Sequence, residues 1–212
     1  MALLEAFSGD GRALELKDLA ARTGLYKSTI LRLAATLTDA GMLQRDIEGR
    51  FRLGPKLAQL GLSYQRGLGM TERIRSALRR LVAETGESAS FYVRSGDSRL
   101  CLMRENSTQS VRHHLEEGSI LPLEIGAAGR LLLAFGGAPG KAMQRIREQR
   151  IAESVGERDP LVAAVAAPVC DVSGACIGAL AVSGLVARMT PSRRRTYARL
   201  TATLAAELSR PG

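Results

Sequence analysis

The stretch LKDLAARTGLYKSTILRLAATLTDAGMLQRDIEGRFRLG, which runs from Leu16 to Gly54, decides how the first part of this chain folds. Its opening apolar residues recur three and four positions apart, so a short helix is predicted that ends at Thr23-Gly24. A second helix follows and closes near Gly41, a residue suited to the left-handed cap position. Its predicted buried side consists of Ile30, Leu31, Leu33, Ala34 and Leu37. Two helices joined by a tight glycine-containing turn form a helix-turn-helix.

The residues after the second helix predict a β-hairpin. A turn from Asp46 to Gly49 interrupts a set of strand-type residues, which are Leu43, Ile47, Phe51 and Leu53. Arg45, Arg50 and Arg52 belong to the same hairpin. A hairpin that directly follows a helix-turn-helix is a wing, so the segment predicts a winged helix-turn-helix.

The start of the second helix is basic and hydroxylic. The first turn of a helix has unpaired backbone N–H groups and a partial positive charge, so it attracts phosphate oxygens. Lys27, Ser28 and Thr29 stand in that turn, and Arg32 lies about one turn later, where it can reach a guanine or another phosphate. An isolated serine here is also typical of a plain helix cap. The paired helices, the glycine turn and the arginine-rich hairpin together favour DNA binding.

The charge balance agrees with a polyanionic partner but does not establish one. The 212 residues include 30 Lys+Arg and 21 Asp+Glu, which gives a formal net charge of +9. The excess is spread over both parts of the chain rather than gathered in a tail. Many basic proteins have no role with nucleic acids, so the placement of the charges decides. The length favours one small and one medium domain.

The sequence carries no sign of a membrane or secretory destination. Its apolar stretches are far shorter than the roughly 20 residues needed to cross a bilayer, and its first residues lack the basic region and cleavage site of a signal peptide. We therefore expect a cytoplasmic protein with no membrane partner. Cys101, Cys170 and Cys176 match no zinc spacing, which favours buried reduced thiols and no metal site.

A linker helix is predicted after the wing, and a further helix over residues 71–85. The linker helix carries four residues on one stripe, Leu57, Leu60, Gly61 and Tyr64. This stripe is a natural dimer seam, and the alternative is that it packs on its own domain.

The remaining sequence predicts an antiparallel sheet with helices packed on it. SASFYVRSGDSRLCLMREN reads as two strands around a turn, SVRHHLEEG as another strand, and GAAGRLLLAF as a helix. Two apolar strands surround Ser173-Gly174, and a closing helix begins with Thr190 as N-cap and Pro191 at its first position. This α+β arrangement is similar to a GAF-like sensor fold.

No pattern in the sequence points to catalysis. Gly-x-Ser-x-Gly, His-Glu-x-x-His and a phosphate-binding glycine loop are all missing from the sequence. The piece GAAGR has only Gly126 and Gly129, which favours close packing at a helix start over a nucleotide site. We therefore expect neither an enzyme nor a cofactor, and a Cys-dependent hydrolase is a weaker alternative.

The stretch LKDLAARTGLYKSTILRLAATLTDAGMLQRDIEGRFRLGPKLAQLG resembles the winged helix-turn-helix of IclR-type bacterial transcription regulators. The pieces GSILPLEIGAAGRLLLAF, AAVAAPV and GALAVSG...RMTPSR resemble, in the same order, their C-terminal effector-binding domain. The resemblance implies a homodimer or dimer of dimers that binds double-stranded operator DNA. Tyr26 stands where proline is common in the family, and we add it to the expected DNA contacts.

The resemblance also implies a site for a small-molecule effector. The positions carried over from the family are Gly126, Ala127, Ala128, Glu157, Val165, Ala181 and Ser183. Val165 and Ala181 are apolar where relatives that bind small keto acids often have polar residues or cysteine, which suggests a larger or more apolar ligand such as an aromatic acid. Successive side chains of a strand point to opposite faces. In the strand predicted for SVRHHLEEG, His113 should therefore point inward, while Arg112 and His114 point outward. A lone inward histidine is also typical of a satisfied core residue.

These expectations divide the chain into a winged helix-turn-helix over residues 1–54, a linker helix over 55–70 and an effector-binding and oligomerisation domain over 71–212. The predicted function is a ligand-responsive transcription regulator. The alternative is an interaction protein whose winged helix binds another protein and whose sensor domain only dimerises. The sequence leaves open which effector is bound, and whether the regulator represses or activates.

Overall fold

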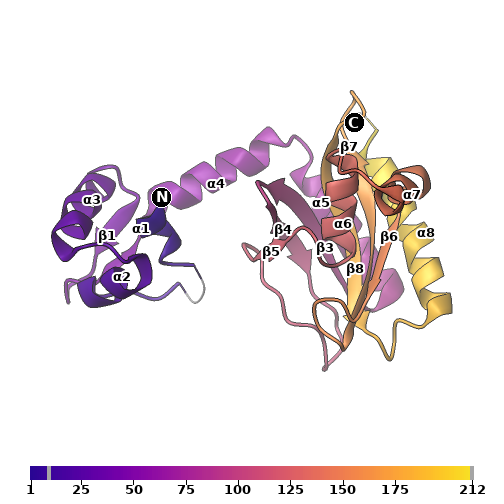
Figure 1. The fold of residues 1–212 in the computed structure, drawn as a ribbon, viewed down its shortest axis with the longest axis horizontal. Helices are drawn as coiled ribbons and strands as arrows, with labels where there is room; N and C mark the ends of the chain where they lie inside the picture. Colours follow the sequence, from indigo (N-terminus) through magenta and orange to yellow (C-terminus); the bar gives the residue numbers. More distant parts are fainter. Residues whose placement is uncertain (9–10, 211–212) are drawn as a thin grey trace. The chain divides into compact units, whose positions relative to one another are not determined.

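The computed structural model describes residues 1–8 and 11–210, and the chain forms two compact units, residues 1–69 and 70–212 (Figure 1). The linker helix falls in the first unit. Among the described residues, no helix is both long and apolar enough to span a bilayer.

The first unit is a winged helix-turn-helix, as predicted. Its elements are α1 (Ala2–Glu5), α2 (Leu16–Thr23), α3 (Lys27–Asp39), β1 (Leu43–Arg45), β2 (Phe51–Leu53) and α4 (Pro55–Gly67). Gly24 has a φ of 69°, a left-handed conformation that costs glycine little, and it ends α2 tightly enough for α3 to begin three residues later. Leu19, Ile30 and Phe51 are fully buried at the centre of the core between these elements.

Three apolar residues of this unit were wrongly expected in the core or in a strand. Leu31 and Leu33 are exposed, because the buried stripe of α3 contains only Ile30, Ala34 and Leu37, which are spaced by four and three. Ile47 lies in the turn of the wing, between the two strands, and its side chain is fully exposed.

The second unit is the predicted α+β domain with an antiparallel sheet. Its elements are α5 (Thr71–Thr85), β3 (Ser88–Ser95), β4 (Ser98–Glu105), β5 (Ile120–Pro122), α6 (Ala127–Phe135), α7 (Lys141–Gln149), β6 (Ala152–Val155), β7 (Val162–Cys170), β8 (Cys176–Leu185) and α8 (Pro191–Leu208). The strand order is β5-β4-β3-β8-β7-β6, and all the described pairings are antiparallel. Helices α6 and α7 cover one face of the sheet, while α5 and α8 pack on the other.

The strand predicted for SVRHHLEEG does not form. Residues 106–119 are a loop, and the short strand β5 pairs with the edge of β4 instead. Side chains of neighbouring elements hold the loop: Arg188 Nη1 donates to Val111 O at 3.1 Å, and Arg104 Nη2 donates to His113 O at 2.9 Å. These bonds satisfy backbone groups that a strand would have paired with a ladder.

Two local predictions from glycine and threonine are confirmed. A Cβ at Gly129 would collide with the guanidinium of Arg99 and the carbonyl of Leu123, so GAAGR marks close packing at the start of α6. Thr190 caps α8, because its hydroxyl accepts a hydrogen bond from Arg193 N at 3.4 Å.

Candidate DNA-binding surface and effector cavity

One side of α3 is open to solvent and forms the candidate DNA-binding face. We call it the α3 face, and its residues, at positions i, i+3, i+4, i+7 and i+8, are Ser28, Leu31, Arg32, Ala35 and Thr36. Tyr26, at the N-cap of α3, is 85% exposed, Lys27 is exposed beside it, and Thr29 is partly exposed. Within the described part of the chain, neither Lys27 nor Arg32 has an ion-pair partner.

The arginines of the wing are not equally available. Asp46 accepts hydrogen bonds from Glu48 N and Arg50 N through Oδ1, which shapes the turn, and its Oδ2 lies 2.8 Å from Arg50 Nε and 3.5 Å from Arg52 Nε. Arg45 stacks on Phe51, with its guanidinium carbon 4.5 Å from the ring centre. The charges of Arg50 and Arg52 are therefore partly balanced by Asp46, whereas Lys27, Arg32 and Arg45 have no ion-pair partner among the described residues.

A cavity in the second unit gathers the predicted effector positions. It opens beside the N-terminus of α6. Its volume is about 510 Å³, which includes space at the mouth that is open to solvent. The predicted residues that line it are His113, Gly126, Ala127, Ala128, Glu157, Ala181 and Ser183. The lining residues that the sequence did not single out are Tyr92, Arg99, Leu121, Ser154, Arg158, Asp159, Val162 and Ala164.

Val165 does not line the cavity, although it was expected to. Alternate residues of a strand face opposite sides of a sheet, and in β7 Val162 and Ala164 face the cavity. Val165 therefore points to the other face, where it is fully buried. The resemblance of AAVAAPV to the family motif located the correct strand, but the residue that lines the cavity is Ala164 rather than Val165.

The N-terminus of α6 already has acceptors from the protein itself. Gly126 N donates to Glu157 Oε2 at 2.9 Å, and Ala127 N donates to Ser154 Oγ at 3.0 Å. Glu157 also pairs with Arg130 at 2.9 Å. A carboxylate is thus placed where the helix dipole favours negative charge.

Arg99 is a buried cation in the cavity wall. It is 4% exposed, and its Nη1 donates to the carbonyl oxygens of Pro122 and, at 2.7 Å, Ile125. No carboxylate in the described part of the chain pairs with it, and its Nε has no hydrogen-bond partner there. Burial lowers the pKa of this guanidinium. An arginine within the apolar run SRLCLM was the sequence signal for this residue.

His113 reaches the cavity from the loop rather than from a strand. Its Nε2 contacts Arg158 Nη2, and its Nδ1 is buried without a partner among the described residues. Burial and then the charge of Arg158 lower the pKa of His113 to about 4, so the ring is neutral at pH 7. Arg112 and His114 are exposed, which is the facing that was expected for them.

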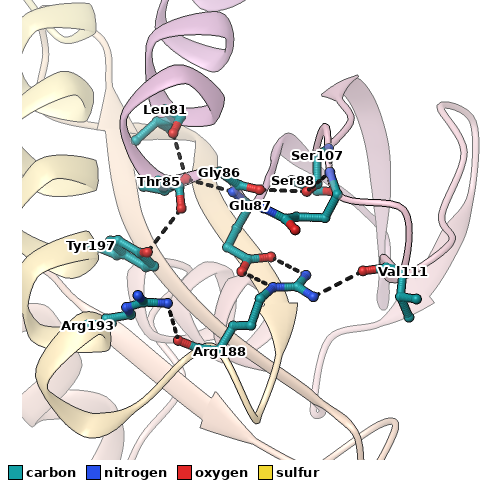
Figure 2. A network of polar contacts seen from close by, with 11 residues as sticks. Leu81, Thr85, Gly86, Glu87, Ser88, Ser107, Val111, Arg188, Arg193 and Tyr197 are labelled. Carbon is teal, nitrogen blue, oxygen red and sulfur yellow. Dashed lines mark hydrogen bonds and ion pairs between the residues drawn. The ribbon is translucent and has the colours of Figure 1, made fainter.

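The loop that carries His113 is tied to the rest of the domain by an ion pair whose acid is buried. Glu87 is 3% exposed, and its two carboxylate oxygens lie 2.6 and 2.8 Å from Nε and Nη2 of Arg188. Figure 2 shows that Arg188 uses its remaining nitrogen to reach Val111 O on the loop. The pair therefore anchors one side of the cavity wall.

Two family models match this chain. The IclR helix-turn-helix domain matches residues 1–46, and the bacterial transcriptional regulator IclR C-terminal domain matches residues 63–139 and 140–210. The chain belongs to the IclR family. As an IclR-family member it is a transcription regulator with a DNA-binding domain and an effector-binding domain, and it is not an enzyme.

Known regulators can be aligned with most of this chain. The HTH-type transcriptional regulator BhcR of Paracoccus denitrificans is 27% identical over 92% of this chain and 80% of its own length. The structure of an IclR transcriptional regulator from Silicibacter sp. is 25% identical, with a TM-score of 0.83 over 97% of this chain and 92% of that chain. An IclR homologue from Microbacterium hydrocarbonoxydans, complexed with 4-hydroxybenzoate, is 20% identical, with a TM-score of 0.83 over 98% of this chain and 95% of that chain.

The cysteines of this IclR-family chain are free thiols. Cys101 and Cys170 are buried, and Cys176 is partly buried. Burial raises the pKa of Cys101, and it raises the pKa of Cys176 to about 11. These two thiols are therefore protonated at neutral pH, which is the opposite of what a nucleophilic cysteine needs.

Proposed function

We propose that this regulator binds operator DNA through the α3 face and the wing, and that a small organic acid in the cavity changes its affinity for DNA. The observation that carries the proposal is the cavity itself, because it brings His113 from the 106–119 loop and Ser183 from β8 to one place beside an apolar wall. Because a gene regulator works on DNA in the cell interior, we also propose a cytoplasmic location.

The DNA-binding part rests on exposed charge. Lys27, Arg32 and Arg45 can bind DNA phosphates and so displace the counterions that surround them. The logarithm of the association constant for DNA is therefore expected to fall linearly with the logarithm of the salt concentration, with a slope of about 0.9 per phosphate neutralised. Footprinting on the DNA that flanks its own gene, at low and at moderate salt, tests this. No protected site at low salt favours the alternative in which the winged helix binds another protein.

The ligand part rests on the chemistry of the cavity. A neutral histidine can donate a hydrogen bond to a carboxylate, and Leu121, Val162, Ala164 and Ala181 offer an apolar wall. The ring of Tyr92 lies in the same wall. These surfaces suit a compact, partly apolar acid, and 4-hydroxybenzoate, which the relative from Microbacterium hydrocarbonoxydans contains, is a rational first probe.

Calorimetry and DNA titrations on matched variants test the ligand part. We expect His113→Leu and Ser183→Ala to weaken the response to small acids while leaving operator binding intact. His114→Leu and Ser192→Ala are the controls, because both side chains are exposed away from the cavity. Unchanged ligand affinity in both His113→Leu and Ser183→Ala would remove these residues from the site.

We further propose that α4 is the seam of a dimer, in which two DNA-binding units meet two half-sites of an operator. No residue of α4 is buried, and Leu60 and Tyr64 are about half exposed on the predicted stripe. Sedimentation at micromolar concentration is expected to give dimers or tetramers, and Leu60→Lys should shift them to smaller species. Leu62→Lys, on the other side of the same helix, is the control. Wild-type monomers would contradict the seam.

A further inference from the structure

The wall of the cavity contains two arginines and two carboxylates, and only one of the carboxylates is in an ion pair among the described residues. Two guanidinium groups line it, those of Arg99 and Arg158, while Arg104 binds His113 and Arg130 pairs with Glu157. The carboxylates at the cavity are those of Glu157 and Asp159. The charges of the lining residues therefore balance in number, so what matters is which of them are paired.

The two carboxylates are already occupied. Glu157 pairs with Arg130 and accepts from the N-terminus of α6, so it is held away from Arg99 and Arg158 by its own contacts. Asp159 accepts a hydrogen bond from Leu161 N at 2.9 Å, which folds the turn before β7. Neither acid forms an ion pair with Arg99, Arg104 or Arg158 in the described part of the chain.

The first uncompensated cation is Arg99. A buried charge is costly unless an opposite charge or other polar contacts compensate for it. Two backbone carbonyls and the ring of Tyr92, whose centre lies 5.5 Å from the guanidinium carbon, do so here only in part. Gly126 and Gly129 leave the guanidinium room beneath the first turn of α6, since a Cβ at either position would press on it. A buried cation thus lies in the cavity wall, and no carboxylate among the described residues pairs with it.

The second cation without an ion-pair partner among the described residues is Arg158, which is exposed on the loop before β7. Its guanidinium contacts the ring nitrogen of His113, which is neutral and cannot balance its charge. Arg104 binds His113 O on the 106–119 loop and Ser90 Oγ on β3, and it too is buried without a carboxylate partner among the described residues. Positive charge is therefore present at two places in the wall, one on β4 and one on the loop side.

We propose that the effector carries two negative charges, with one anionic group held by Arg99 and the other by Arg158 and His113. The proposal rests on the proposed function, in which the cavity binds a small organic acid. Each anionic group replaces solvent with charge-assisted hydrogen bonds and supplies the counter-charge that the protein lacks. A monoacid of the same skeleton satisfies one cation and leaves the other uncompensated.

Calorimetry with matched pairs of acids tests the proposal on the full-length protein. The aromatic pairs are isophthalate and terephthalate against benzoate, and the aliphatic pair is adipate against hexanoate. At least one diacid is expected to bind roughly 10- to 100-fold more tightly than its monoacid, since a hydrogen bond to a charged group contributes about 1.5–3 kcal/mol. Phenyl phosphate, which carries both charges on one group, distinguishes a single doubly charged head from two separate anionic ends.

Variants locate the two anchors. Arg158→Gln and Arg99→Gln should each reduce the preference for the diacid to a few-fold while the monoacid is affected less. Arg112→Gln, an exposed arginine of the neighbouring loop, is the matched control and should keep the full preference. Arg158 is an exposed residue, so its replacement is expected to leave the fold intact even if Arg99→Gln does not fold.

The outcomes separate the two proposals. If a monoacid binds as tightly as its diacid and shifts operator affinity equally, the dianion is overturned while the proposed function stands. If a diacid is preferred but Arg158→Gln keeps that preference, the assigned anchor is wrong. If none of these acids binds or changes DNA affinity, the acid-sensing function itself fails.

Discussion

The α3 face and the effector cavity both present cations to an anion, but they do so in opposite surroundings. Lys27 and Arg32 stand in water, where each charge is screened by salt and gains little from any single partner. Arg99 is buried, where a charge without a partner is costly and a partner is worth more. The first arrangement suits a long polyanion held by many weak contacts, and the second suits a small ligand held by few strong ones.

The ion pairs of the two units repeat this contrast. In the wing, Arg50 pairs with Asp46 and Glu48 at the surface, and the pairs shape a turn. In the second unit, Glu87 and Arg188 form a pair whose acid is buried, and the pair anchors the loop that carries His113. Breaking a pair of each kind measures how much the surroundings matter.

The largest effect is expected for Arg188→Met. This change leaves the Glu87 carboxylate buried without its counter-charge, and the free energy of unfolding should fall by about 3 kcal/mol, the lower end of the range for buried pairs, because Arg188 is 24% exposed. Urea denaturation measures the loss. The double variant Glu87→Gln with Arg188→Met removes both charges and should recover part of it. A single variant as stable as the wild type would mean that the pair contributes nothing to folding.

The next effect is expected on the exposed side of the comparison. Arg32→Ala should weaken operator binding about tenfold and reduce the steepness of the salt dependence by about 0.9, the loss of one phosphate contact. The fold should be unaffected, because Arg32 lies on the open α3 face. Arg79→Ala, an exposed arginine of α5, is the control. Equal salt slopes for Arg32→Ala and wild type would place Arg32 off the DNA backbone.

The sequence predicted the elements that local chemistry determines. The glycine turn at Gly24, the hairpin around Asp46 and the cap at Thr190 all formed where expected, because each depends on residues within a few positions. The sequence failed where partners come from far along the chain. Residues 111–118 alternate like a strand, yet Arg188 and Arg104 fix them as a loop, and only the folded sheet brings those arginines there.

The same reasoning explains the cavity. Motif order located the N-terminus of α6 and the end of β8, because these positions follow from resemblance. The facing of β7 was misjudged at Val165, since a shift of one residue reverses the side of a strand. Arg99 was missed because its place beside the apolar residues of SRLCLM is a signal for burial only, and nothing local says that the buried arginine has no carboxylate partner.

A smaller effect is expected when the pH is lowered, because His113 lies partly buried at the effector cavity. Because the pKa of His113 is about 4 in the folded protein, below its usual 6.5, the unfolded chain binds the extra proton between these values. The free energy of unfolding should therefore fall by about 1 kcal/mol as the pH drops from 6.5 to 4.5, after allowance for solvent screening. Arg158, Arg104, Asp159 and His114 set this environment. The decline should be absent from His113→Gln and unchanged in His114→Gln; an identical decline in all three would assign it to other groups.

The smallest effect is expected in the wing, where the partly buried acid Asp46 pairs with Arg50 and Arg52. Asp46→Asn keeps the Oδ1 acceptor for Glu48 N and Arg50 N, so the turn of the wing should persist, but it removes the charge that holds Arg50 and Arg52. Affinity for non-operator DNA at low salt should rise about threefold, as expected for one exposed charge, and the gain should vanish at high salt. Asp46→Ala, which loses the turn as well, separates charge from geometry. If Asp46→Asn instead lowers the affinity, Arg50 binds DNA while it is paired with Asp46. The ion pair would then serve to hold the arginine in the position that contacts DNA, rather than to withhold its charge.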